Sequence, residues 1–307
     1  MRLKIKENST TITRRLIQIL AFLTINYIII EAIFPINLIS LEGFIKFLPI
    51  LNSPRNPLSN GAGILEYIFY SMANGLFPFF MIGVLILVFL FSNRVFCGWI
   101  CPIGTIQDAC AAIPTKKKKF SIQTHQSLLK IKYIFVIIII IIIFPLGITR
   151  NTNYIFYTEF KNTIGAFADQ PVGFFSLSEF LFVYFPTIIQ EIFPFSWDYF
   201  ASYTIIGFYI LIILISVWYP RFYCRYFCPF AAVASAVSDY SFLKLSRNPV
   251  KCIGRSECGL CERLCPKQIR ILDEPFEFFT GKGECNLCLK CKEKCPYDAI
   301  QIKFINF

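Results

Sequence analysis

The chain has 307 residues, of which 56% are hydrophobic and 17% aromatic, and it carries a formal net charge of +11. Its apolar residues form runs too long for strands or ordinary core helices, which excludes a typical soluble globular protein. The only histidine is His125, which we expect to be a solvated loop residue. A b-type haem with its two axial histidines is therefore excluded. No Gly-x-Gly-x-x-Gly turn is present, which excludes a dinucleotide site of that kind.

Four apolar runs are each long enough to cross a hydrocarbon core of about 30 Å as a helix. They are 16–36, 68–91, 131–148 and 203–218. Two further apolar segments, 38–51 and 174–195, are expected to be helices lying in the outer interface. Glu31, late in the first run, is the one acidic side chain clearly inside a predicted span. Intramembrane carboxylates are costly and often functional, and an interfacial position near the outer edge is the alternative.

Positive charge is distributed unevenly between the segments that join these spans. Of the 30 Lys and Arg residues, all but Lys46, Arg55, Arg150 and Lys161 fall in segments that the four-span arrangement places on one side. Positive residues accumulate on the cytoplasmic side, so we expect a multi-pass protein of the cytoplasmic membrane with both termini inside. The same bias, helped by anionic membrane lipid, explains the run 116–119 and argues against a nucleic-acid partner.

A repeat links the cytoplasmic ends of the second and fourth predicted spans. The chain reads Arg-Val-Phe-Cys-Gly-Trp-Ile-Cys-Pro over 94–102 and, 127 residues later, Arg-Phe-Tyr-Cys-Arg-Tyr-Phe-Cys-Pro over 221–229. Two consecutive helical hairpins would point the same way and bring these motifs together at the cytoplasmic border. The candidate border site consists of four cysteines and two arginines: Cys97, Cys101, Cys224, Cys228, Arg94 and Arg221.

Three interpretations of the border cysteines remain open. They are small buried hydrophobic residues, a redox-active pair of thiols, or the ligands of a further iron–sulfur centre. Arg94 and Arg221 would lower thiolate pKa values or offset the charge of a cluster. Cys110 has no partner pattern, and we expect it to serve packing only.

Eight further cysteines form two quartets near the C-terminus, each closed by Cys-x3-Cys-Pro. This spacing is typical of proteins that hold two [4Fe–4S] clusters, in which each motif supplies the fourth ligand of the other cluster. The predicted ligands of cluster 1 are Cys252, Cys258, Cys261 and Cys295. The predicted ligands of cluster 2 are Cys285, Cys288, Cys291 and Cys265. The first quartet has a five-residue gap where two residues are usual, which widens one loop and leaves the ligand count intact.

Zinc and disulfides are the alternatives for these eight cysteines. Zinc sites usually show two Cys-x2-Cys pairs with a longer spacer, and disulfides suit an oxidising compartment.

The apolar runs, the repeat and the cysteine quartets together predict a mainly helical protein. Its four-helix polytopic membrane domain, over 1–240, is built as two pseudo-repeated hairpins and precedes a small α+β two-cluster ferredoxin domain over 241–307.

Paired Cys-x3-Cys-Pro motifs on four spans, followed by a two-cluster ferredoxin, resemble the membrane polyferredoxin family that includes NapH and the membrane portion of NosR. The sequence contains no counterpart of the periplasmic flavin domain of NosR-like members, which makes the NapH type the nearest resemblance. The resemblance implies electron transfer across or along the cytoplasmic membrane, coupled to quinol. The implied partners are menaquinol or ubiquinol and other redox proteins, such as a ferredoxin-like subunit, a cytochrome or a periplasmic reductase.

Two classes of function follow from these patterns. The first is a quinol-dehydrogenase type subunit that passes single electrons between quinone or a partner protein and its clusters. The second is an accessory protein that reduces metal or thiols during the assembly of another redox enzyme. The predicted outer loops contain no Met-rich or His-rich metal-handling motif, which favours the first class.

Overall fold

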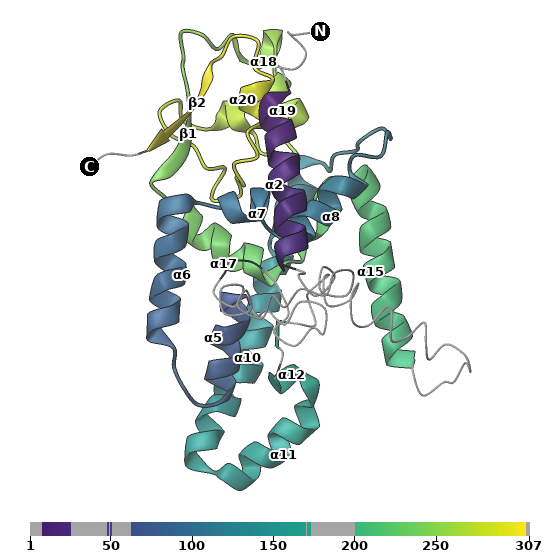
Figure 1. Ribbon diagram of the computed structural model, residues 1–307, viewed down its shortest axis with the longest axis vertical. Coiled ribbons are helices and arrows are strands. Elements are labelled where there is room, and N and C mark those ends of the chain that lie inside the picture. The colour runs from purple at the N-terminus through teal and green to yellow at the C-terminus, as the bar shows by residue number, and fades with distance from the viewer. Residues whose placement is uncertain are drawn as a thin grey trace.

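The computed structural model describes residues 8–25, 48, 50, 63–169, 171–172 and 200–304. Within them the chain is mainly helical and ends in a small domain with one two-stranded sheet. Figure 1 shows this domain at one end of the long axis and helix α11 (Tyr154–Ile164) at the other. The described chain ends within the small domain, and its first described residue contacts the same domain, where Lys294 Nζ donates to Asn8 Oδ1.

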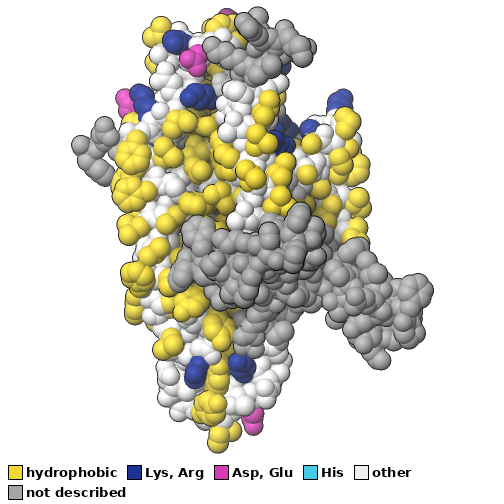
Figure 2. Space-filling view, viewed as in Figure 1, with side chains coloured by type: hydrophobic (Ala, Val, Ile, Leu, Met, Phe, Trp, Pro, Cys, Tyr) yellow, Lys and Arg dark blue, Asp and Glu magenta, His cyan; other side chains and the backbone are white. Residues whose placement is uncertain are grey.

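Five helices form the elongated body between these ends. They are α2 (Ser9–Ile25), α5 (Ile64–Ala73), α6 (Phe79–Ser92), α10 (Ile131–Thr152) and α15 (Phe200–Trp218), with the four-residue α12 (Ala166–Asp169) following α11. Large apolar side chains such as Leu20, Phe80 and Ile141 are exposed along them. Figure 2 shows hydrophobic side chains over much of the visible face of this body, with most of the visible Lys and Arg toward the small domain.

One helix in the described part of the chain is long and apolar enough to cross a membrane. It is the continuous stretch Ile122–Thr152, which contains α10 and the short preceding helix α9 (Ile122–Leu129). Only 28% of its most apolar window is buried inside the protein, whereas the core helix of a soluble protein would be mostly buried. The predicted span 131–148 lies within α10, and 203–218 lies within α15.

The prediction of one continuous helix over 68–91 is wrong, because the chain turns between α5 and α6. Gly75 has a φ of 72°, a left-handed conformation that ends a helix, and Pro78 caps the next helix without an N–H to donate. Helix α5 packs on α10 so closely that a Cβ on Gly147 would lie 2.1 Å from the Met72 carbonyl oxygen. Each half is shorter than the roughly 20 residues that a spanning helix needs.

Other predicted boundaries also differ from the structure. Helix α2 begins at Ser9, before the predicted start at residue 16, because its first half packs against the ferredoxin domain and helix α8 (Pro102–Cys110). The remainder of that predicted span, with Glu31, lies outside the described residues. The same holds for the segments 38–51, apart from residues 48 and 50, and 174–195.

The two repeats have the same local structure at the border. A five-residue helix precedes a longer helix in each: α7 (Val95–Trp99) with α8, and α16 (Phe222–Tyr226) with α17 (Pro229–Ser238). Both longer helices start with Pro at their first position, where the missing N–H costs nothing. The second cysteine of each motif is therefore the N-cap residue of α8 or α17.

The small domain is built on an antiparallel pair, β1 (Leu243–Arg247) and β2 (Ile300–Phe304), with Leu243 opposite Phe304. Four short helices carry its loops: α18 (Gly254–Glu257), α19 (Leu260–Leu264), η4 (Ile271–Asp273) and α20 (Lys290–Glu293). Its apolar core includes Leu245, Ile271 and Phe279. Val95 of α7 packs against this core, so the domain and the border helices form a continuous structure.

Candidate functional site

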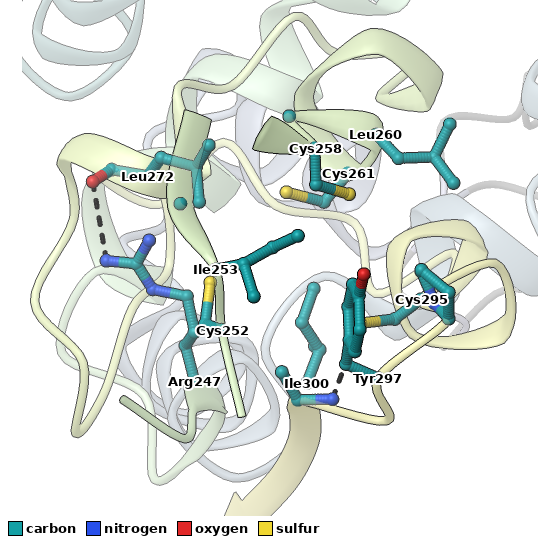
Figure 3. Close-up of a pocket in the computed structure, with 14 residues that line it drawn as sticks. Arg247, Cys252, Ile253, Cys258, Leu260, Cys261, Leu272, Cys295, Tyr297 and Ile300 are labelled. Atoms are coloured by element: carbon teal, nitrogen blue, oxygen red, sulfur yellow. Dashed lines mark hydrogen bonds between the residues drawn. The ribbon is translucent and has the colours of Figure 1, made fainter. Parts of the chain in front are cut away.

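The four cysteines predicted for cluster 1 line one cavity of the small domain: Cys252, Cys258, Cys261 and Cys295. Figure 3 shows their sulfur atoms approaching the cavity from different sides, with apolar side chains such as Ile253 between them. Gly254 and Gly259, with φ of 86° and 57°, allow the tight bends that place this widened loop around the cavity. The five-residue gap in the first quartet is accommodated by α18.

The second predicted set lines a second cavity: Cys265, Cys285, Cys288 and Cys291. In both cavities one cysteine comes from the other sequence motif, so the structure has the exchanged arrangement. Among the described residues, no three Cys, His, Asp or Glu side chains are close enough to bind a single metal ion. The thiolates that bind an iron–sulfur cube approach it from different directions, and four cysteines line each of these two cavities.

The four border cysteines also converge. Cys101 interacts electrostatically with Cys224 and Cys97, and Cys228 interacts with all three of the others. Cys101, Cys224 and Cys228 are buried, and Gln107 Nε2 of α8 donates to Cys224 Sγ at 3.2 Å. This hydrogen bond joins the first repeat to the second.

The chemistry of these buried thiols narrows the three interpretations. All thirteen cysteines lie within the described residues, and each is a free thiol. Burial, with the neighbouring Cys224 and Cys97, raises the pKa of Cys101 to about 12. A redox-active thiol needs a lowered pKa, whereas a bound metal deprotonates a thiol outright. The raised pKa of Cys101 therefore disfavours a reactive thiol pair, and it agrees either with buried cysteines that serve packing or with the ligands of a metal centre.

Both border motifs contact the loops that surround the second cavity. A Cβ on Gly98 would lie 2.2 Å from the Asn286 carbonyl oxygen, and Trp99 Nε1 donates to the Leu287 carbonyl at 2.9 Å. From the second motif, the Cys224 carbonyl accepts from Lys267 Nζ at 3.2 Å. The border cysteines are thus held directly against the segments that carry the cluster 2 cysteines.

Asp108 of α8 lies buried among three arginines. Arg221 donates to both carboxylate oxygens, at 2.9 and 2.7 Å, and Arg14 and Arg15 approach to 3.5 and 3.6 Å. Burial by itself would raise the pKa of Asp108, but Arg221 and Arg14 hold it well below its usual range. Arg221 also donates to the Cys97 carbonyl at 2.9 Å, so Asp108 and Arg221 join the two repeats.

Glu284 forms a similar centre between the border and the ferredoxin domain. Its carboxylate pairs with Arg94 at 3.0 Å, with Lys132 of α10, and with Lys267 at 3.9 Å. Burial by itself would raise the pKa of Glu284, but Arg94, Lys132 and Lys267 lower it to about 2. Arg94 also donates to the Gly283 carbonyl at 3.0 Å, which anchors the small domain to the start of α7.

The two predicted arginines therefore have an additional role that the motif alone did not indicate. Each interacts with the first cysteine of its own motif, Arg94 with Cys97 and Arg221 with Cys224. Their strongest partners are nevertheless carboxylates, because a fully buried guanidinium needs a counter-charge. Sequence reasoning missed Asp108. The available signal was that it is the only acidic residue between Glu66 and Glu159.

Two minor predictions can also be placed. His125 is not a solvated loop residue: it lies on α9, with Nδ1 2.8 Å from the Tyr226 hydroxyl and 3.0 Å from Arg225 Nη2. Aromatic residues of the second border motif explain this partial burial. Cys110 lies at the end of α8, half-buried and apart from the four border cysteines.

Comparison with known proteins matches the border region. The profile of a family described as a 4Fe-4S binding domain matches residues 74–121 and 201–248, two segments with the same 127-residue offset as the cysteine motifs. NosR of Pseudomonas aeruginosa, a regulatory protein, is 26% identical over 67% of this chain. These matches support a relationship to the NapH/NosR-type polyferredoxin-like family. The matched segment covers only 25% of NosR, so it corresponds to one part of that protein.

Other relatives of this polyferredoxin have similar levels of identity. An uncharacterized protein of Methanocaldococcus jannaschii is 28% identical over 72% of this chain and 76% of its own length. YccM of Escherichia coli, named for electron transport, is 26% identical over 74% of this chain and 57% of its own length. No solved structure matches the polyferredoxin.

Proposed function

We propose that this polyferredoxin is an electron-transfer subunit of the NapH type, which passes single electrons between quinol or a partner protein and its iron–sulfur clusters. The observation that carries the proposal is the direct contact between the border cysteine motifs and the loops of the second cavity. Electron transfer requires closely spaced centres, and these contacts bring the border motifs next to the proposed cluster 2.

Two [4Fe–4S] clusters are assigned to the ferredoxin domain. Cluster 1 is assigned to Cys252, Cys258, Cys261 and Cys295, and cluster 2 to Cys265, Cys285, Cys288 and Cys291. Backbone N–H groups of Ile269 and Ala299 donate to Cys265 Sγ and Cys295 Sγ, both at 3.4 Å. Such hydrogen bonds stabilise the charge of a thiolate and tune the potential of a bound cluster.

A third iron–sulfur centre is assigned to Cys97, Cys101, Cys224 and Cys228. The surrounding buried groups fit an anionic occupant, because several of them are hydrogen-bond donors without an acceptor among the described residues. These donors are Nε and Nη1 of Arg14, the Tyr223 hydroxyl and Nδ2 of Asn286. Sulfide and thiolate sulfurs accept hydrogen bonds, and the charge they carry would offset the cations left over around Asp108 and Glu284.

The three sites then form a series that leads away from the membrane. The border cysteines adjoin the loops of the second cavity, and Cys291 of that cavity interacts electrostatically with Cys261 of the first. Bound clusters supply one-electron redox chemistry, and the protein contributes their spacing, their burial and the hydrogen bonds to their sulfurs. Cluster 1, at the far end of the series, is the expected point of exchange with a soluble partner.

We assign the polyferredoxin to the cytoplasmic membrane as a multi-pass protein, with its ferredoxin domain in the cytoplasm. The support is the exposed apolar band and the concentration of Lys and Arg at the ferredoxin end (Figure 2). Within the described residues, Arg150 and Lys161 are the basic residues of the opposite end, in or beside α11.

Cys97→Ser tests the border centre, with Cys110→Ser as a matched control on the same segment. After anaerobic purification, the unsubstituted protein and Cys110→Ser should each hold about twelve irons, and Cys97→Ser about eight. Added menaquinol should reduce the clusters of the first two proteins but not those of Cys97→Ser, and EPR measures this reduction. Equal iron and equal reduction in all three proteins would remove the border centre from the proposal.

A further inference from the structure

A basic cavity lies between the border helices and the ferredoxin domain. Its volume is about 260 Å³, and its lining includes Arg15, Lys117, Lys118, Lys119, Arg263 and Lys290. Among the described residues, Asp108 is the only carboxylate that lines it, and that carboxylate is already paired with Arg221, Arg14 and Arg15. Its cations therefore exceed what the protein itself neutralises.

A buried arginine adds a fixed positive charge to the wall of this cavity. Arg225 lines the cavity and is 2% exposed. One end of its guanidinium is held by Gln268 Oε1 at 2.7 Å and by His125 Nδ1 at 3.0 Å. The guanidinium also lies over the Tyr226 ring, 4.8 Å from the ring centroid. None of these partners carries a negative charge, so Arg225 adds to the excess of positive charge that an anion in the cavity would offset.

The cavity lies at the level expected for lipid headgroups. The backbone N–H of Lys118 donates to the Trp218 carbonyl at 2.9 Å, and Lys117 Nζ donates to the Val217 carbonyl at 2.8 Å, both at the end of α15. Trp218 is exposed there, and exposed tryptophan at the end of a spanning helix marks the membrane–water interface. The lysine run is thus fixed on the membrane surface.

We propose that this cavity binds a phosphate group, supplied by an anionic phospholipid of the inner leaflet. The placement at the membrane surface rests on the proposed function. A cavity of this size suits a phosphate better than the broad surface that a protein partner would need. Cys265 and Pro266 line both this cavity and the second cysteine cavity, so the bound phosphate lies next to a cluster 2 ligand. Its negative charge disfavours added electrons there, which makes the reduction potential of cluster 2 dependent on the lipid.

The double substitution Lys118→Gln, Lys119→Gln tests the site, because both lysines are exposed and substitutions at exposed positions usually change stability little. The control is Lys244→Gln, Lys303→Gln, which removes two lysines paired across β1 and β2, outside the cavity. Binding of short-chain phosphatidylglycerol and of inorganic phosphate to the full chain is measured calorimetrically in neutral detergent. Iron content is measured on the same samples, so a failure of cluster assembly is recognised separately.

The expected result is that the cavity variant binds phosphatidylglycerol roughly tenfold more weakly than the unsubstituted protein and the control, with the difference reduced at high salt. Comparable binding of inorganic phosphate would support the phosphate site and identify a soluble phosphate as its source. Equal phosphatidylglycerol binding by all three proteins, or binding of neither probe, would overturn the proposal. The second outcome would favour an acidic protein as the partner of these cations.

Discussion

Arg94 and Arg221 occupy equivalent positions in the two repeats, yet they are neutralised by different parts of the molecule. Arg221 pairs with Asp108 of the first repeat, whereas Arg94 pairs with Glu284 of the ferredoxin domain. The position equivalent to Asp108 in the second repeat is Ser235, which cannot neutralise an arginine. Arg221 therefore joins the two repeats to each other, whereas Arg94 attaches the ferredoxin domain to the repeats.

The two repeats also differ in what packs against Ser235, the position equivalent to Asp108. Ser235 packs so closely on the ferredoxin domain that a Cβ on Gly283 would lie 2.0 Å from the Ser235 carbonyl oxygen. An aspartate there would bring its charge close to Glu284. In the second repeat a small residue therefore stands at this position and lets the ferredoxin domain approach, and Glu284 of that domain supplies the carboxylate for Arg94.

Asp108→Asn should have the largest effect, because it removes the counter-charge of three arginines at once. Breaking a buried ion pair by removing one partner usually costs about 3–5 kcal/mol. We expect a correspondingly large loss of thermal stability and loss of iron from the border site. Asp298→Asn, at an exposed aspartate, is the control. A melting temperature of the Asp108 variant equal to that of the control would show that the repeats are held together without this centre.

Glu284→Gln should affect attachment of the ferredoxin domain more than the body of helices. The lost charge-assisted hydrogen bonds are each worth about 1.5–3 kcal/mol. The remaining contacts between the domain and the border helices reduce the resulting loss of stability. We expect faster amide hydrogen exchange along β1 and α7, with little change in α10 beyond Lys132. If exchange increased equally throughout the helices, Glu284 and Asp108 would serve the same function and the comparison would fail.

The sequence predicted the parts of this arrangement that depend on local spacing. Cys-x3-Cys-Pro placed both cysteines of each motif together, and the quartets indicated which cysteines share a cavity. The break in 68–91 was overlooked because hydropathy outweighed the turn signals at Gly75 and Pro78. Asp108 and Glu284 could not be assigned from sequence, because their partners lie 113 and 190 residues away and meet only after folding.

Gly98→Ala should have the smallest effect on the free energy of unfolding. It should also separate the role of the close contact at Asn286 from the role of the ion pairs at Asp108 and Glu284. The added methyl would lie 2.2 Å from the Asn286 carbonyl oxygen, so the border motif must move away from the cluster 2 loop. Gly83→Ala is the control, because nothing lies within 4 Å of a Cβ there. Overpacking at Gly98 should cost about 1–3 kcal/mol. Because Asp108 and Glu284 are untouched, iron content should stay constant while reduction of the ferredoxin clusters by menaquinol slows. Unchanged reduction kinetics in Gly98→Ala would show that close contact at Asn286 is not needed for transfer, and electrons would then have to reach the ferredoxin domain through the second motif at Lys267.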